Sequence, residues 1–406
     1  MQQLMNFLSC AMLIYFMTNE IKITINNLYL NQLESYMSTN KLASYSKSIE
    51  KLIHENSKEL KATPYEKFCI FNRRYMGSKT KLLGFIEESI KDVVGEYSSF
   101  VDIFSGTGVV GHHFNDKSVK VISNDLLYSN YITNYAFLSN ESFDYDKIDK
   151  ILKQFNEIKS RENYFSKHFG DKFFSNDIAK KIGTIRESIE KLHKKQEINF
   201  RERAILIASL IYASDKIANT CGHYDAYRGN GDFSDKLELK HLDIFHQNNL
   251  NNEIYNQDSN TLFQTLEYEV DIVYADPPYN SRQYSSLYHL VENLARWQKP
   301  EVEGKASKMK NRKDYNSRYC NKTAIEAFDE LISNVKAKYF ILSYSDMGTK
   351  GNDRSNARMS DKDIIKVMEQ KGKLTIKDMH HQAFSTGKSK IDNHKERLFI
   401  CELNRC

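Results

Sequence analysis

The sequence predicts an α/β fold, a Rossmann-like sheet interrupted by a mostly helical insertion. Short apolar segments bounded by Gly, Asn or Asp alternate with helical patterns over about 70–140, and again from about 255 onward. The residues between them are highly charged, and they indicate helices and polar loops. A strand-loop-helix-strand order is typical of an α/β sheet. We therefore expect an N-terminal helical extension (1–65), a two-part α/β domain (66–140 and 255–406) and an inserted domain (141–254).

The first part of the sheet is expected just after residue 70. Apolar residues spaced three and four apart predict a helix over 79–94. A short apolar strand over 100–104 leads into a glycine-rich turn. A second strand over 119–123 ends in Asn124-Asp125.

The insertion and the second part of the sheet follow the same reasoning. Within the insertion, a helix is predicted over 201–217, with one strongly apolar side. The sheet then resumes with these expected elements: strand 270–275, helix 285–297, strand 339–343, helix 361–370, and strands near 374–376 and 398–402.

Composition excludes several classes of protein. A mean hydropathy of -0.60 and 27% charged residues argue against a membrane protein. The apolar run 4–17 is too short to span a bilayer, and no Lys or Arg precedes it, as a signal peptide would require. The six cysteines include no CxxC pair, so we expect no metal site and reduced thiols in the cytoplasm. The net charge of +5 permits a nucleic-acid partner without requiring one.

Proline is scarce, and half of it lies in one dipeptide. The chain has four prolines, where about 20 would be average for its length. Because no cysteine follows a proline, the Pro-Cys nucleophile of cytosine carbon-5 methyltransferases is excluded. The dipeptide Pro277-Pro278 predicts a rigid turn.

Glycines gather in the turn after the first strand. Gly106, Gly108 and Gly111 fall within the segment that begins Asp102-Ile103-Phe104-Ser105. Glycine allows a sharp turn and a close ligand approach, and the following helix offers free N–H groups, as in nucleotide-type cofactor sites. Asp125, at the end of the next strand, is placed to hold ribose hydroxyls; the alternative is a helix N-cap.

The rigid turn has the sequence Asp276-Pro277-Pro278-Tyr279 and follows the apolar strand 270–275. The Asp276 carboxylate and the Pro277 carbonyl are expected to point the same way, as two acceptors that suit an exocyclic amino group. Tyr279 offers a face on which a base stacks, a contact worth roughly 1–3 kcal/mol. A third segment, 73–79, would by itself be only a helix start with Ser78 as N-cap, but its place ahead of the glycine turn favours a role in the site.

In order and content these motifs resemble the D12-class, alpha-type adenine-specific DNA methyltransferases, which include the Dam methylases. The resemblance covers about 70–140 and 250–406. It implies an S-adenosylmethionine (AdoMet)-dependent methyltransferase sheet with an inserted target-recognition domain. It also implies cofactor contacts from Tyr75 (in place of a usual Trp) and Lys79, a methionine site at Asp102, Phe104, Gly106 and Gly108, ribose at Asp125, and adenine at Asp258. The same resemblance assigns catalysis to Asp276, Pro277, Pro278 and Tyr279, with Asp276 also bordering the cofactor, and places 339–346 beside the target base.

DNA contacts are expected in four places. Residues 295–322 carry nine basic and three acidic residues. This stretch either clamps the phosphate backbone of DNA or is an ordinary solvated face, and the two interpretations are equally good. Arg282, Gln283 and Tyr284 directly follow the turn Asp276–Tyr279 and are expected to contact DNA near the flipped base. In the insertion, His223, Tyr227 and Arg228, with Tyr224 and Asn230, either contact DNA or form a polar loop that caps the helix 201–217. A second basic loop spans 388–397.

The resulting hypothesis is methyl transfer from AdoMet to the N6 amino group of adenine in a specific DNA sequence, after base flipping. We expect a modification enzyme of a restriction-modification system, monomeric on double-stranded DNA, cytoplasmic and nucleoid-associated, with a cognate endonuclease as candidate partner. One alternative keeps the fold and methylates cytosine N4, RNA or protein. Another is a non-catalytic DNA-binding protein with a decayed methylase fold.

Overall fold

The structure is a computed structural model, and it describes residues 67–220, 222–229, 231, 233–234, 236–244, 251–345, 357–380 and 395–404. These residues belong to one compact unit, Lys67–Cys406. The expected helical extension over 1–65, Asn230, Asp346 and residues 388–394 of the second basic loop lie outside the described residues.

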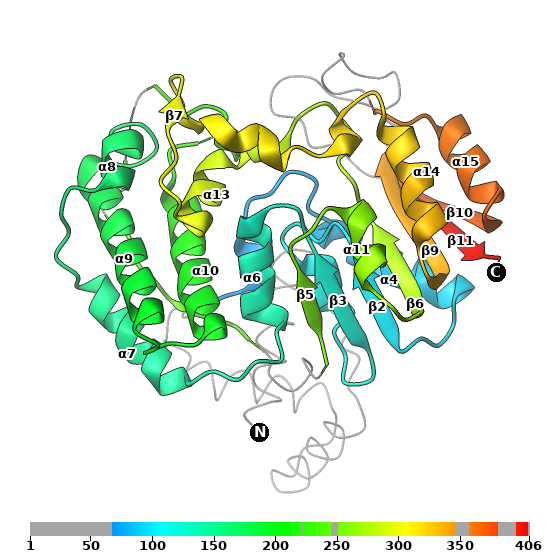
Figure 1. The fold of residues 1–406 in the computed structure, drawn as a ribbon, viewed down its shortest axis with the longest axis horizontal. Coiled ribbons are helices and arrows are strands. Elements are labelled where there is room, and N and C mark those ends of the chain that lie inside the picture. The colour runs from blue at the N-terminus through cyan, green and yellow to red at the C-terminus, as the bar shows by residue number, and fades with distance from the viewer. Residues whose placement is uncertain are drawn as a thin grey trace, which may run out of the picture. The chain divides into compact units, whose positions relative to one another are not determined.

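The central element is a seven-stranded sheet in the order β10-β11-β9-β6-β2-β3-β5 (Figure 1). Five neighbouring strands run parallel, and β11 is antiparallel to both β9 and β10. Since parallel strands end at the same edge, the carboxyl ends of five strands meet there, together with the first residues of β11. The strands are β2 (Ser99–Asp102), β3 (Lys120–Asn124), β5 (Glu253–Tyr255), β6 (Val270–Ala275), β9 (Ala337–Ser345), β10 (Gly372–His380) and β11 (Lys395–Leu403).

Helices cover both faces of this sheet, because successive side chains of a buried strand point to opposite faces. Phe100 belongs to one apolar cluster and Val101 to the other; Ile272 and Val273 divide in the same way. One cluster includes α11 (Ser259–Thr265), α14 (Ala324–Asn334) and α15 (Asp361–Glu369). The other includes α4 (Leu83–Val93), α5 (Val109–His113), α6 (Tyr128–Leu138), α12 (Tyr284–Leu287) and α13 (His289–Arg296).

The helices of the predicted insertion share the second of these cores. They are α7 (Tyr145–Asn156), α8 (Tyr164–Phe169), α9 (Asn176–Lys194) and α10 (Phe200–Ile217). Buried Arg186 of α9 donates to the carbonyls of Leu294 and Ala295 at 2.7 and 2.8 Å, which satisfies the carboxyl end of α13. A short parallel pairing of β1 (Lys67–Phe68) with β4 (His241–Leu242) adds a further tie. The predicted insertion is thus packed into the same core as α6, α12 and α13.

Most predicted elements are present, with boundaries moved by a few residues. The strand over 270–275 is confirmed residue for residue as β6. β10 and β11 extend beyond their apolar centres because they pair with each other along their whole lengths. β5 begins at Glu253, slightly inside the predicted insertion.

Three elements are present but differ locally from the prediction. The helix predicted over 79–94 begins as a 3₁₀ turn, Thr80–Leu82, and α4 follows with Leu82 as N-cap. Ser78 is therefore no N-cap, and its hydroxyl shares a 2.9 Å hydrogen bond with that of Thr80. The helix predicted over 285–297 is divided at Tyr288 into α12 and α13. The strand predicted over 100–104 ends at Asp102, where the glycine turn begins.

The basic stretch 295–322 also contains secondary structure that its sequence did not predict. β7 (Val302–Glu303) pairs with β8 (Lys308–Met309), and two 3₁₀ helices, η4 (Lys310–Tyr315) and η5 (Arg318–Cys320), follow. Among the described helices, none combines the length and apolarity needed to cross a membrane.

Candidate active site

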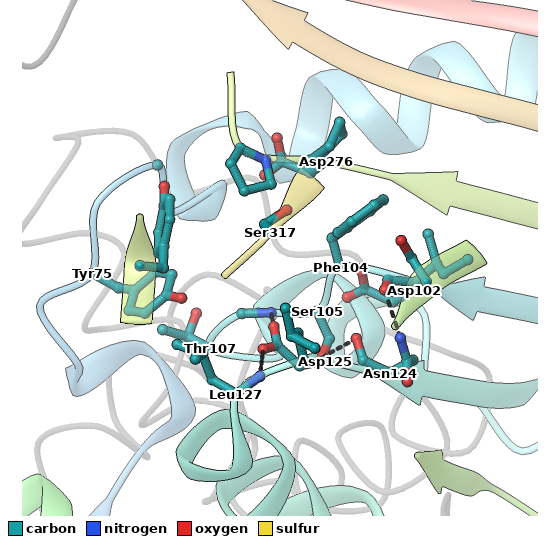
Figure 2. Close-up of a pocket in the computed structure, with 18 of the residues that line it drawn as sticks. Tyr75, Asp102, Phe104, Ser105, Thr107, Asn124, Asp125, Leu127, Asp276 and Ser317 are labelled. Carbon is teal, nitrogen blue, oxygen red and sulfur yellow. Dashed lines mark hydrogen bonds between the residues drawn. The ribbon is translucent and has the colours of Figure 1, made fainter. Parts of the chain in front are cut away.

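A pocket opens at the carboxyl edge of the sheet, and most predicted site residues line it. Figure 2 shows Tyr75, Asp276, Phe104 and Asp125 arranged around the same space. The predicted residues in its wall are Tyr75, Lys79, Asp102, Phe104, Gly106, Asp125, Asp258, Asp276, Pro277, Pro278, Tyr279 and Tyr284. Segments far apart in the sequence are therefore brought together as the motifs predicted.

The turn after β2 requires glycine at two positions. Gly106 and Gly108 have φ values of +51° and +81°, a region that other residues rarely adopt. A Cβ on Gly108 would lie 2.1 Å from Asn134 Oδ1 in α6, and one on Gly106 would lie 3.3 Å from the Tyr75 ring. Gly108 thus packs beneath the pocket, while Gly106 forms its floor against Tyr75.

Asp102 is a buried acid at the base of the pocket. Its Oδ2 accepts a 3.0 Å hydrogen bond from the Gly111 amide. Burial raises the pKa of Asp102 to about 8, and the nearby carboxylates of Asp276 and Asp125 act in the same direction. A cationic group beside Asp102 would stabilise its ionised form, as the ammonium of an amino acid would.

Asp125 receives two backbone hydrogen bonds at the end of β3. Its two carboxylate oxygens accept from the amides of Gly106 and Leu127, both at 2.8 Å. Burial raises the pKa of Asp125 to about 6. The alternative interpretation as a helix N-cap is wrong, because the N-cap residue of α6 is Leu127.

The free amides that begin α6 are instead satisfied by Glu292 of α13. Its buried carboxylate accepts from Tyr128 N at 2.9 Å and from Ser129 N at 2.8 Å. Arg296 also donates to Glu292, at 2.6 Å. Sequence reasoning missed Glu292, since a residue so far along the chain gives no local sign of capping α6.

Asp276 forms an ion pair inside the pocket. Lys79 Nζ lies 2.9 Å from Asp276 Oδ1. The family resemblance predicted a cofactor contact for Lys79 but not this ion pair. Burial raises the pKa of Asp276 to about 6, although Lys79 acts against this shift. Burial also disfavours the charge of Lys79, but Asp276 and Glu396 more than offset this and raise its pKa.

The segment that carries Tyr75 is fixed to the helices after the catalytic turn. Tyr75 stacks on Tyr288 with ring centroids 4.4 Å apart, and Asn130 donates to its hydroxyl at 2.9 Å. Met76 N donates to Tyr288 Oη at 2.8 Å, and Tyr284 Oη donates to Met76 O at 3.1 Å. Tyr284, predicted to contact DNA, therefore uses its hydroxyl within the chain while its side chain lines the pocket.

The other end of the pocket is lined by Gln283, which was expected near the target base, and by Tyr315 and Ser317, which the motifs did not identify. All three line it beside the half-buried Tyr279. The Gln283 side-chain amide donates to Ser317 O at 3.0 Å and accepts from Ser317 N at 2.8 Å. The guanidinium carbon of Arg296 lies over the Tyr315 ring, 4.0 Å from the ring centroid. Tyr315 and Ser317 belong to the stretch 295–322, whose charge suggested a DNA contact but whose position beside the pocket was not predicted.

Asp258 lies at the edge of the pocket as the N-cap of α11. Its carboxylate accepts from Asn260 N at 2.9 Å. The neighbouring Gln257 is held to Asn124 of β3 by two hydrogen bonds of 3.1 and 3.2 Å. Asp258 therefore borders the pocket with one carboxylate oxygen committed to the cap, and its contact with the cofactor adenine stays a prediction.

The remaining predicted DNA contacts lie outside the pocket lining. Arg282 and Arg228 are exposed, and His223 is half-buried. Tyr227 packs against Phe173 with ring centroids 5.4 Å apart. Tyr224 is buried and donates its backbone amide to Leu287 O at 2.7 Å, so this loop is folded against α12.

The basic stretch 295–322 is largely neutralised by ion pairs within the chain. Lys299, Lys308 and Arg318 pair with acids from other segments. Lys310 and Arg312 pair with Glu301 and Glu303 of the same stretch at 2.6 Å each. Its sequence charge therefore overstates the positive charge that it offers to a partner.

Comparison with known proteins agrees with this geometry. The sequence profile of the D12 class N6 adenine-specific DNA methyltransferases matches residues 75–351. The chain belongs to this family. The Type II methyltransferase M.NlaIII of Neisseria lactamica is 31% identical over 79% of this chain and 95% of its own length.

Two further relatives are also Type II methyltransferases. The Type II methyltransferase M.FokI of Planomicrobium okeanokoites is 36% identical over 68% of this chain, which spans 45% of that protein. The Type II methyltransferase M.CviAII of Paramecium bursaria Chlorella virus 1 is 28% identical over 80% of this chain and 97% of its own length. The chain is thus an adenine-specific DNA methyltransferase by family, and DNA is its implied partner.

Proposed function

We propose that this methyltransferase transfers a methyl group from AdoMet to N6 of an adenine flipped out of a specific double-stranded DNA sequence. The observation that carries this proposal is one pocket that holds both the glycine turn with Asp102 and Asp125 and the turn Asp276–Tyr279. The first group suits a cofactor with an amino acid and a ribose; the second suits a planar base with an amino group.

The residues at the cofactor end fit AdoMet. Gly106 leaves a space beside Tyr75 that a Cβ would narrow, and Asp102 is buried where a cationic ammonium is favoured. Asp125 and Asp258 would hold the ribose and the adenine, while Tyr75 and Phe104 supply flat apolar surfaces. When bound, AdoMet supplies an electrophilic methyl group on a sulfonium.

The chemistry of the other end concerns the adenine amino group, whose lone pair is delocalised into the ring. Asp276 and the Pro277 carbonyl would accept hydrogen bonds from its two N–H groups and favour a tetrahedral nitrogen with a localised lone pair. Locking of the turn by Pro277 and Pro278 would hold these acceptors in place, so that positioning contributes to the rate. In this scheme the enzyme forms no covalent intermediate.

Target recognition is assigned to the insertion and to the loops that border the pocket. Arg282 and Arg228 are exposed and could contact phosphates or base edges, as could His223 and Tyr227 after rearrangement of their loop. Lys305, Lys313 and Lys322 are the exposed lysines of the basic stretch for which we propose phosphate contacts.

The names of the relatives bear on the cellular role. Relatives named as Type II methyltransferases support a modification enzyme of a restriction-modification system. We further propose that it acts as a monomer on cytoplasmic, nucleoid-associated DNA, with a cognate endonuclease as partner. Sequencing methylated positions in host DNA, with and without the gene, would test the modification role. We expect one short sequence to be modified at nearly all its copies; modification scattered over unrelated sequences would argue against a site-specific enzyme.

Tyr279 provides a test of base flipping. We expect Tyr279→Ala to remove the stacking surface for the flipped base and to weaken its retention by roughly 1–3 kcal/mol. The measurement is the fluorescence of 2-aminopurine placed at the target adenine, which increases when the base leaves the duplex. Tyr279→Phe keeps the ring and should respond like the wild type. An Ala variant with the full wild-type fluorescence change would show that Tyr279 does not hold the base.

A further inference from the structure

A second carboxylate lies beside the Lys79–Asp276 pair. Lys79 Nζ is 2.9 Å from Asp276 Oδ1 and 4.0 Å from Glu396 Oε2. The three side chains are 7%, 21% and 12% exposed, so water screens their charges only weakly. Glu396 belongs to none of the catalytic or cofactor motifs, although it falls within the second basic loop, 388–397.

The topology of the sheet explains this meeting. Asp276 follows the carboxyl end of β6, and Glu396 is near the start of β11, opposite Ser345 at the end of β9. Because β11 runs antiparallel to β9, its first residues lie at the edge where the parallel strands end. The strand β9 separates β6 from β11, and Lys79 reaches both carboxylates from the segment before α4.

We propose that Glu396 is a positioning residue, which shares the Lys79 ammonium with Asp276 and so keeps the Asp276 carboxylate available to the adenine amino group. This role rests on the proposed N6 methylation. An ammonium committed to Asp276 alone would compete with the adenine N–H groups for the same oxygens. A second anion draws part of that charge away and leaves Asp276 a stronger acceptor.

The charges around the cluster define the expected titration. Glu396 raises the pKa of Asp276, whereas Lys79 lowers it. Among the described residues, the other titratable groups that interact with the cluster are Asp102, Tyr274, Tyr279 and Tyr284, and burial raises the pKa of each above its usual value. The variants below leave these groups unchanged. Opposite shifts of the Asp276 pKa on removing Glu396 and on removing Lys79 would therefore come from those two side chains.

The experiment titrates Asp276 in the free protein by ¹³C NMR of labelled aspartate carboxyls, with the Asp276 signal assigned by its loss in Asp276→Asn. Glu396→Gln should lower the midpoint by about one pH unit, and Lys79→Met should raise it by about the same amount. Glu396→Asp should restore most of the wild-type midpoint. Glu402→Gln, an exposed position on the same strand, is the matched control and should leave it unchanged.

Methyl transfer supplies the second measurement. In Glu396→Gln, kcat at its pH optimum should fall about tenfold, less than for a group that touches the reacting atoms, and its acid limb should move to lower pH. If Glu396 acts through Lys79, adding Glu396→Gln to Lys79→Met should cause no further fall. The AdoMet affinity of Glu396→Gln, measured by calorimetry, and its circular dichroism spectrum should stay at wild-type values.

Two results would overturn the role of Glu396: an unmoved Asp276 midpoint in Glu396→Gln, or independent losses that add in the double variant. The NMR titration needs neither DNA nor AdoMet. A wild type that titrates as expected but does not methylate adenine would therefore contradict the proposed function rather than the contact between these three groups.

Discussion

Asp276→Asn is expected to reduce kcat for DNA methylation by about 10³-fold, the upper end of the range seen when one group that stabilises the transition state is removed. The amide has nearly the shape of the carboxylate, but it offers one acceptor instead of two and presents N–H groups to the adenine amino group. Asp276→Ala, which leaves no side-chain acceptor, should abolish transfer. The loss should appear in single-turnover kinetics with AdoMet and DNA both saturating.

The same variant should keep its cofactor site, because Asp102, Asp125 and the glycine turn are untouched. We expect the AdoMet Kd to change by about threefold or less, below 1 kcal/mol. Glu267→Gln, which removes an exposed acid in the turn before β6, is the control and should behave as the wild type. An equal loss of AdoMet binding in Asp276→Asn would contradict this division of roles.

Gly108→Ala is expected to destabilise the fold and the cofactor site together. At φ +81° a side chain costs about 1–2 kcal/mol, and the new Cβ would also lie 2.1 Å from Asn134 Oδ1, in a core where overpacking costs about 1–3 kcal/mol. Urea unfolding should therefore show a loss of about 2–5 kcal/mol. AdoMet binding should weaken at temperatures where the variant is still folded, since the turn above Gly108 forms the pocket floor.

Two variants separate the causes. Gly84→Ala in α4 places its Cβ in open space, so its stability should equal or slightly exceed that of the wild type. Adding Asn134→Ala to Gly108→Ala should recover part of the loss, because it removes the clash but leaves the backbone strain. If Gly108→Ala unfolds at the wild-type urea concentration, neither the clash nor the strain is real.

Much of the fold could be predicted because its strands are short, apolar and bounded by turn residues. The pattern around 270–275 predicted β6 fully, since a buried strand needs apolar side chains on both faces. The full lengths of β10 and β11 depend on hydrogen bonds between them, which polar residues make equally well. Apolar patterning alone therefore predicted only their centres.

The candidate site likewise has a part that the sequence predicts and a part that it does not. The glycine turn and the turn Asp276–Tyr279 are local, so their residue order indicates their chemistry. The partners Glu292 and Glu396 act across the fold on α6 and on Lys79, and nothing near them in the sequence predicts those contacts. The basic stretch 295–322 misled in a different way, because a count of charges does not reveal the ion pairs that neutralise them.

The most direct test of the central claim is the identity of the methylated product. The purified protein is incubated with methyl-labelled AdoMet and double-stranded DNA, and the DNA is then digested to nucleosides and separated. We expect the label in N6-methyldeoxyadenosine with the wild type and none with Asp276→Asn. Label in N4-methyldeoxycytidine, transfer only to RNA or protein, or no transfer by the wild type would contradict the claim.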